Sequence, residues 1–166
     1  MVWSPSKAAT DIRPLSPNLL AYIATNQTAA LRWANGNLDG LVNFAVIYNT
    51  DEGSHQNSIF PNLQVFGERH NTRFGDDGLH VEYSLAFIYE ITGTDATQLR
   101  KDAKKYGYAL ESMIVNIPDT ALMNGVSDYL GANIEELSVD HNPLIKGEEA
   151  NWMIASFLRV TFKFWE

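Results

Sequence analysis

Cysteine is missing from the 166 residues of this sequence, which excludes disulfide bonds and thiolate metal sites. No run of about 18 apolar residues occurs, so a membrane-spanning helix is not expected. The opening residues, MVWSPSKAATDIRP, lack the apolar segment of a secretory signal peptide. Together these absences predict a soluble protein that is not secreted.

Basic residues are few, since 12 Lys and Arg stand against 20 Asp and Glu and give a net charge of -8. This balance disfavours a general affinity for nucleic acid or for an anionic membrane surface. The hydrophobic content of 45% and the aromatic content of 11% are sufficient for a folded core at this length. Internal repeats and low-complexity tracts are absent, so we expect one folded domain.

Motifs of nucleophilic catalysis and phosphate binding are also lacking. No G-x-S-x-G elbow occurs. The turn ITGTDATQ, which follows a strand and opens a helix, has one glycine and places Asp95 where a bound anion would lie. We therefore expect Thr94 or Asp95 to be the N-cap of that helix rather than part of a phosphate site.

Metal-ligand spacing is not found either. The four histidines are His55, His70, His80 and His141. His80 and Glu82, one residue apart on a strand, could supply two ligands, but no third follows at a metal-site spacing. The acidic pairs are Asp51–Glu52, Asp76–Asp77, Glu135–Glu136 and Glu148–Glu149. These pairs lack the spacing of oxygen ligands in a calcium loop, so we predict no metal site. Because the motifs of phosphate binding and nucleophilic catalysis are also missing, we predict no cofactor and no catalytic residue.

The first third of the chain predicts an arm, a helix and a strand. Residues 1–16 contain two prolines among Ser and Thr, which is typical of an extended arm. Ser16-Pro17 resembles an N-cap followed by proline at the first helical position, and apolar residues then recur at helical spacing until Asn35-Gly36. Residues 41–48, LVNFAVIY, favour a buried strand. We expect the folded domain to span residues 17–166.

The remaining residues predict a long hairpin, a helix and a final pair of strands. NLQVFGERH and LHVEYSLAFIYEI flank the turn FGDDG, and the second segment alternates apolar and polar residues. From residue 96, apolar side chains step by three and four as in an amphipathic helix. A short helix is expected in TALMNGVSDYLG, and the chain closes with the strands NIEELSVDHNPLIKG and NWMIASFLRVTFKFWE. The predicted class is α+β, a mainly antiparallel sheet with two principal helices packed on it.

In this order of elements, with LHVEYSLAFIYEI leading into DATQLRKDAKKYGYALESMI and FLRVTFKFWE closing the chain, residues 17–166 resemble the tail terminator (tail completion) proteins of tailed bacteriophages. The resemblance implies a mixed α+β fold and a homo-hexameric ring that caps the tail tube and joins it to the head connector or stopper. It also implies that the protein is assembled in the host cytoplasm, resides in the virion and has no catalytic residues. DNA would pass through the lumen of the ring without sequence-specific binding.

Two alternatives stay open. One is another neck component of the head-tail junction, such as a connector or stopper. The other is a small α+β enzyme or ligand-binding domain with a site among the loop residues His55, His70, Arg73, Asp76 and Asp77.

Candidate interface residues lie in three segments. They are Trp3 in the arm; Arg69, Arg73, Asp76 and Asp77 in the hairpin; and Arg100, Lys101, Lys104 and Lys105 on the polar side of the helix after it. The hairpin group predicts a charged protrusion. The basic helix face is either solvated or meets an acidic neighbour.

Overall fold

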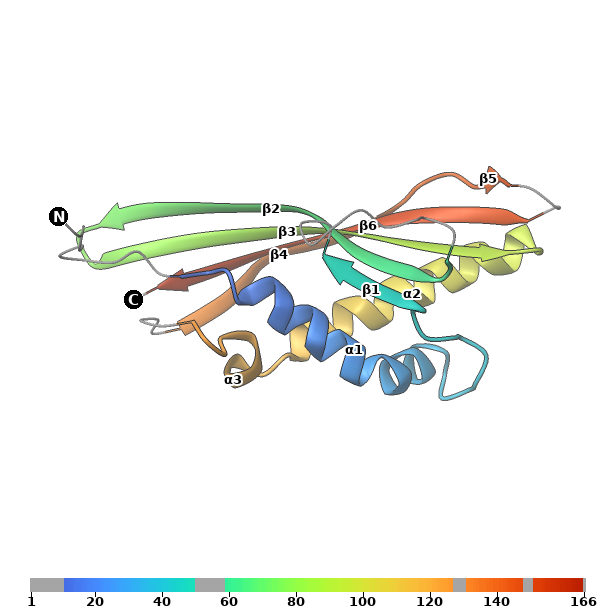
Figure 1. Cartoon of the computed structure of the whole chain (residues 1–166), viewed down its shortest axis with the longest axis horizontal. Coiled ribbons are helices and arrows are strands. Elements are labelled where there is room, and N and C mark those ends of the chain that lie inside the picture. The colour runs from blue at the N-terminus through green and yellow to red at the C-terminus, as the bar shows by residue number, and fades with distance from the viewer. Residues whose placement is uncertain (1–10, 50–58, 127–130, 148–150, 166) are drawn as a thin grey trace, which may run out of the picture.

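A long β-sheet carries two principal helices on one of its faces (Figure 1). The structure, a computed structural model, describes residues 11–49, 59–126, 131–147 and 151–165. The elements are α1 (Leu15–Ala34), β1 (Val46–Asn49), β2 (Asn62–Gly75), β3 (Gly78–Gly93), α2 (Ala96–Asn116), α3 (Asp119–Leu122), β4 (Gly131–His141), β5 (Ile145–Lys146) and β6 (Trp152–Trp165). The predicted α+β class, mainly antiparallel with two principal helices and a long hairpin, is confirmed.

The described strands form one sheet in the order β1-β2-β3-β6-β4, and β5 pairs with β6 beyond the end of β4. Only the β1–β2 pair is parallel among the described pairs. The expected hairpin is β2–β3, which turns at Asp76-Asp77. β3 and β6 stay in register from His80 opposite Trp165 to Gly93 opposite Trp152. Four long strands, β2, β3, β6 and β4, therefore make up most of the sheet.

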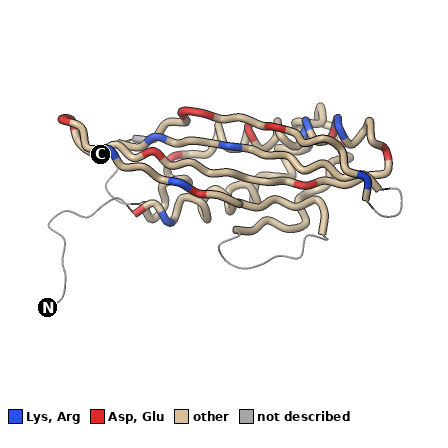
Figure 2. Tube along the Cα trace, turned by 90° about the horizontal axis from the view of Figure 1, so that it is seen from above, with Lys and Arg blue, Asp and Glu red and all other residues tan. Residues whose placement is uncertain are grey.

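The core lies between the sheet and the helices. Alternate side chains of β3 and β6 point to the helix side, because successive residues of a strand face opposite ways. On α2 the buried residues recur at helical spacing, and they include Leu99, Ala103, Tyr106, Leu110 and Met113 as predicted. The opposite face of the sheet has no described helix over it, and Figure 2 shows acidic and basic residues scattered along its strands.

The ends of the helices differ in how they are capped. Asp95 caps α2 as predicted, since its carboxylate accepts hydrogen bonds from the backbone N–H groups of Thr97 and Gln98. The expected cap Ser16 is wrong, because α1 begins at Leu15 and Ser16 is a buried residue inside the helix. α1 ends where expected, and Gly36 takes a left-handed conformation with φ of 69°.

The strand predicted over residues 41–48 is shorter in the structure and begins at Val46. Before it, the backbone N–H of buried Phe44 donates to the side chain of Gln27 on α1, at 2.8 Å. The Ala45 N–H donates to the Pro61 carbonyl. The backbone of this segment is thus bonded to a helix side chain and to a loop instead of a neighbouring strand. Apolar composition alone cannot distinguish these two cases.

The structure describes the beginning of the domain from residue 11 on. Leu15 is fully buried, and Ile12 packs against the core. Residues 1–10 lie outside the described residues, so the division into an arm of residues 1–16 and a domain of residues 17–166 stays a prediction.

Candidate assembly surfaces

The charged hairpin residues gather at the end of the sheet where β2 turns into β3. Arg69 and Arg73 are exposed on β2, and Asp76 and Asp77 form the turn itself. Arg73 lies 3.9 Å from the carboxylate of Glu82 on β3. The ring of His80 lies 3.0 Å from the Asp77 carboxylate, and this hydrogen bond holds the pKa of Asp77 below its usual value.

An exposed aromatic ring completes this tip, since Phe74 is 84% exposed. The turn therefore presents both charge signs and one apolar ring to a partner. This combination of residues is suited to contact with another protein, because aromatic side chains contribute strongly to the binding energy of interfaces.

The basic residues of α2 do not join the hairpin group. α2 begins where β3 ends, at the opposite end of the sheet from the hairpin turn (Figure 1). Arg100, Lys101 and Lys104 are exposed, whereas Lys105 is half-buried and its ammonium donates to the side chain of Asn35 at 2.6 Å. The two predicted charged groups are thus separate surfaces.

A cavity of about 550 Å³ lies beside the basic face. Arg100, Lys104, His141 and Trp152 are among its lining residues. His141 Nδ1 lies 2.7 Å from the hydroxyl of buried Ser156. Burial, followed by the positive charge of Lys104, lowers the pKa of His141. The cavity thus combines basic side chains with an imidazole whose pKa is lowered.

Two of the sequence-based candidates, Trp3 and His55, lie outside the described residues. His70 and Arg73 are both on β2, but they point to opposite faces of the sheet because they are three residues apart. The described members of the loop site considered above therefore do not converge on one point.

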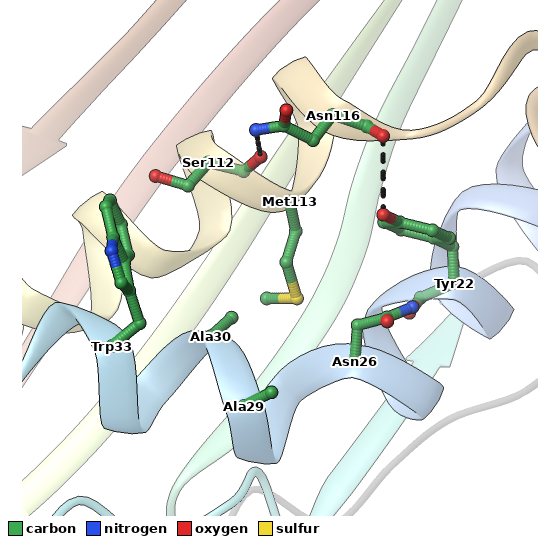
Figure 3. Close-up of a pocket in the computed structure, with 8 residues that line it drawn as sticks. All are labelled: Tyr22, Asn26, Ala29, Ala30, Trp33, Ser112, Met113 and Asn116. Carbon is green, nitrogen blue, oxygen red and sulfur yellow. Dashed lines mark hydrogen bonds between the residues drawn. The ribbon is translucent and has the colours of Figure 1, made fainter. Parts of the chain in front are cut away.

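A groove between the two principal helices was not anticipated from the sequence. It has a volume of about 330 Å³. The residues that line it are Tyr22, Asn26, Ala29, Ala30, Trp33, Ser112, Met113 and Asn116 (Figure 3). Trp33 stacks on Tyr108 of α2 with ring centroids 4.8 Å apart. Both rings are about half exposed.

The sequence of α1 contains a signal for this surface. Among its 20 residues only Arg32 is charged, although a helix at a protein surface usually carries several charges on its outer face. The solvent side of α1 consists mainly of Ala, Thr and Asn. A helix face with so few charges loses little when it is covered by another protein, because interface centres are depleted of charged residues.

Among the residues that the structure describes, the sheet ends in two open edges. On the outer side of β2 the only described partner is β1, which covers Asn62–Val65 and leaves residues 66–75 unpaired. At the other side β4 is the last strand of the described order. Each edge has a bulge, between Val65 and Gly67 on β2 and between Ile134 and Glu136 on β4. Unpaired edges of this length are places where another chain can add a strand.

The uncovered face of the sheet has an aromatic centre. Phe66 and Phe157 meet edge to face with centroids 5.7 Å apart, and the Arg159 guanidinium lies over the Phe157 ring. Beside them Glu90 is buried, which raises its pKa, and the Gln64 amide donates to its carboxylate at 3.4 Å. This face offers apolar area together with charge.

Groups that bind metals are not found in the part of the chain that the structure describes: no three His, Asp or Glu residues there are placed to hold an ion. None of the described helices is both long and apolar enough to cross a membrane.

Comparison with known proteins gives a structural likeness but no match in sequence. No known protein family matches the sequence, and no curated protein is similar to it. The structure is similar to a chain of a particle described as "Virion of native gene transfer agent (GTA) particle". The TM-score is 0.44 and the sequence identity 11%, over 91% of this chain and 98% of that chain. A likeness at this level supports no conclusion about function.

Proposed function

We propose that the chain is a structural virion protein of a tailed phage, a tail terminator whose copies form a ring on the end of the tail tube. The ring, with six copies, joins the tube to the head connector or stopper. No residue is assigned a catalytic role, and no cofactor is required.

The observation that carries the proposal is the pair of strand edges, at opposite sides of one long sheet, that no described strand covers. A monomer that leaves such edges open risks uncontrolled association. A closed ring of identical copies removes them, because each subunit covers one edge of each neighbour. The order of elements, which resembles that of tail terminators, agrees with this role.

Charge supports the same role. With a net charge of -8 the protein has little general attraction for DNA, since cationic contacts to phosphate supply most nonspecific affinity. A ring of such subunits lets DNA pass without holding it. The charged hairpin tip with Phe74 is a surface for docking to the tube protein or to the next ring.

Mass and tube binding test the proposal. Light scattering of the purified protein should give a particle several times the chain mass of 18.6 kDa. Added to growing tubes of the tail-tube protein from the same genome, it should bind tube ends and stop their elongation. A protein that stays at the chain mass at all concentrations and leaves elongation unchanged would refute the proposal. Binding to the connector without any effect on tubes would indicate another neck component.

A further inference from the structure

One row of four residues crosses the whole sheet between its open edges. Arg69 on β2 is opposite Ser84 on β3, Ser84 is opposite Thr161 on β6, and Thr161 is opposite Glu136 on β4. The Ser84 and Thr161 hydroxyls lie 2.9 Å apart, so the inner members of the row are in contact. A cation therefore stands at one end of the row and an anion at the other.

All four side chains are on the face away from the helices. The neighbours of Thr161 along β6, Val160 and Phe162, are buried on the helix side, and strand residues alternate between faces. Directly opposed residues share a face, which places Arg69 and Glu136 on the uncovered one.

The two charged residues cannot neutralise each other within one chain. Three inter-strand spacings, about 14 Å, separate their strands. Both are exposed, and neither forms an ion pair with another described residue.

The strand directions allow the sheet to continue into a second copy. Each of the pairs β2–β3, β3–β6 and β6–β4 is antiparallel, so β2 and β4 run in opposite directions. When a second copy stands beside the first in the same orientation, its β2 meets the β4 of the first as an antiparallel partner. That arrangement extends the sheet with the same kind of pairing that it already has.

From this geometry we infer that neighbouring subunits join edge to edge, residues 67–73 of β2 in one copy pairing with residues 131–138 of β4 in the next, with Arg69 facing Glu136. The inference rests on the proposed function, because it specifies the contact that builds the ring. The partner is a second copy of this chain.

The other residues that this contact would bring opposite each other do not conflict with the register. Between two copies joined in this way, Asn133 of one lies opposite Asn71 of the next, and Ser138 lies opposite Gly67, all on the uncovered face. On the helix side, Leu137 lies opposite Glu68. No row places two like charges together, whereas Arg69 and Glu136 form an attractive pair.

A shift by two residues in either direction loses that pair. A shift by four would place Arg69 opposite Asp140 and Arg73 opposite Glu136, but Asp140 and Arg73 already pair with Arg159 and Glu82 inside the chain. The level register is therefore the one that joins the two charges without an ion pair of their own among the described residues.

Charge reversal tests the contact through reciprocity. Arg69→Glu and Glu136→Arg should each raise the concentration needed for half-maximal assembly about tenfold or more, because repulsion replaces attraction at every interface. Mixed in equal amounts, the two variants should assemble again with strict alternation, since both kinds of mixed contact are then attractive. Native mass spectrometry would show equal numbers of each variant in every ring. Glu135→Arg, at the neighbouring bulge position without a partner on β6, is the matched control and should not co-assemble with Arg69→Glu in this way.

Cross-linking keeps the inference testable if a reversed charge disturbs folding. The chain has no cysteine, so a variant with Arg69→Cys and Glu136→Cys reports on this pair alone. Opposed residues of an antiparallel pair come close enough for a disulfide, whereas the two positions of one chain do not. Oxidation should therefore produce covalent multimers up to the full ring. Arg69→Cys with Lys101→Cys is the control and should produce none.

The outcomes separate this inference from the proposed function. If the wild-type protein forms rings and caps tubes but the cysteine pair gives only monomers, the edge contact is wrong and the terminator role remains. If reciprocity between the charge variants fails while rings form, the register is wrong. If the wild-type chain is monomeric at all concentrations and does not act on tubes, both fail.

Discussion

Single side chains set how closely α2 approaches the sheet. The Tyr89 hydroxyl on β3 donates to the carbonyl of Ala103, at 3.0 Å. A Cβ atom at position 107 would lie 2.8 Å from that hydroxyl and 3.2 Å from Val139, so only glycine fits there without displacement. The helix and the sheet are thus in contact through backbone as well as side chains.

The core stripe of α2 leads to a first prediction. Leu110 is 1% exposed in this stripe. Leu110→Ala should lower the free energy of unfolding by about 2 to 5 kcal/mol, because burial is lost and a cavity remains. Urea unfolding measures the change. Lys101→Ala on the exposed side of the same helix is the control and should stay within about 0.5 kcal/mol of wild type. Equal midpoints for the two variants would contradict the described packing.

His141 leads to a prediction about pH. Its pKa is lowered in the folded state by burial, then by the charge of Lys104, below the ordinary value of 6.5 that applies to the unfolded chain. Between these two values the unfolded state holds more protons, so stability falls as the pH drops below 6.5. His141→Gln should reduce this loss, because glutamine does not titrate.

The free energy of unfolding is measured above and below pH 6.5 for the wild type and for His141→Gln. His70→Gln, at an exposed position, is the control. The interpretation of His141 would be overturned by parallel pH profiles for wild type and His141→Gln.

At the scale of elements, the helices and the hairpin could be predicted because their signals are local. The apolar spacing of α2, the Asp95 cap and the alternation along β3 each depend on neighbouring residues. The parallel placement of β1 and the two bulges depend on partners far along the chain, and no local pattern specifies them. The position of Arg69 level with Glu136 likewise depends on three successive strand registers.

The candidate surfaces were predicted only in part, for a similar reason. Charge and turn residues marked the hairpin tip, which is a local feature. The groove between α1 and α2 requires residues about 80 positions apart to meet, as Ala30 and Met113 do. The scarcity of charge on α1 was visible in the sequence, but its meaning depended on knowing which side of the helix faces the solvent.

The hairpin as an element carries a second kind of contact, which Arg73 can test. Arg73 lies nearer the turn than Arg69, and its ion pair with Glu82 is too exposed to contribute much to folding. Arg73→Glu should leave thermal unfolding near that of wild type, and also the ring mass, because the residue level with Arg73 on the next copy is the uncharged Gly131. It should weaken binding to the tube or connector protein. This binding should also weaken with added salt.

The matched control for Arg73→Glu is Arg159→Glu, which removes a comparable exposed ion pair, with Asp140 at 3.2 Å, away from the turn. Unchanged binding in the Arg73 variant would remove the hairpin tip from the docking surface.

At the scale of the whole molecule, the N-terminal arm is expected to act in assembly and not in folding. Trp3 offers an aromatic anchor, and two prolines lie within residues 1–16. Because Ile12 packs on the core, the informative deletion is residues 2–10. The shortened chain should unfold like the full chain but assemble only at higher concentration.

Light scattering across a dilution series and thermal unfolding measure these two properties of the arm deletion. Normal assembly by the shortened chain would exclude the arm from the interface, and a lower melting temperature would assign it to the fold.

The placement of the two open edges on opposite sides of one sheet governs how assembly can end. If copies join β4 to β2, any open series of copies has one free edge at each extremity, however many copies it contains. Such a series has no stopping point of its own, and only curvature that brings the first copy to the last can complete it. The angle between neighbouring sheets would then determine the copy number, and a variant that flattened that angle would form filaments in place of rings.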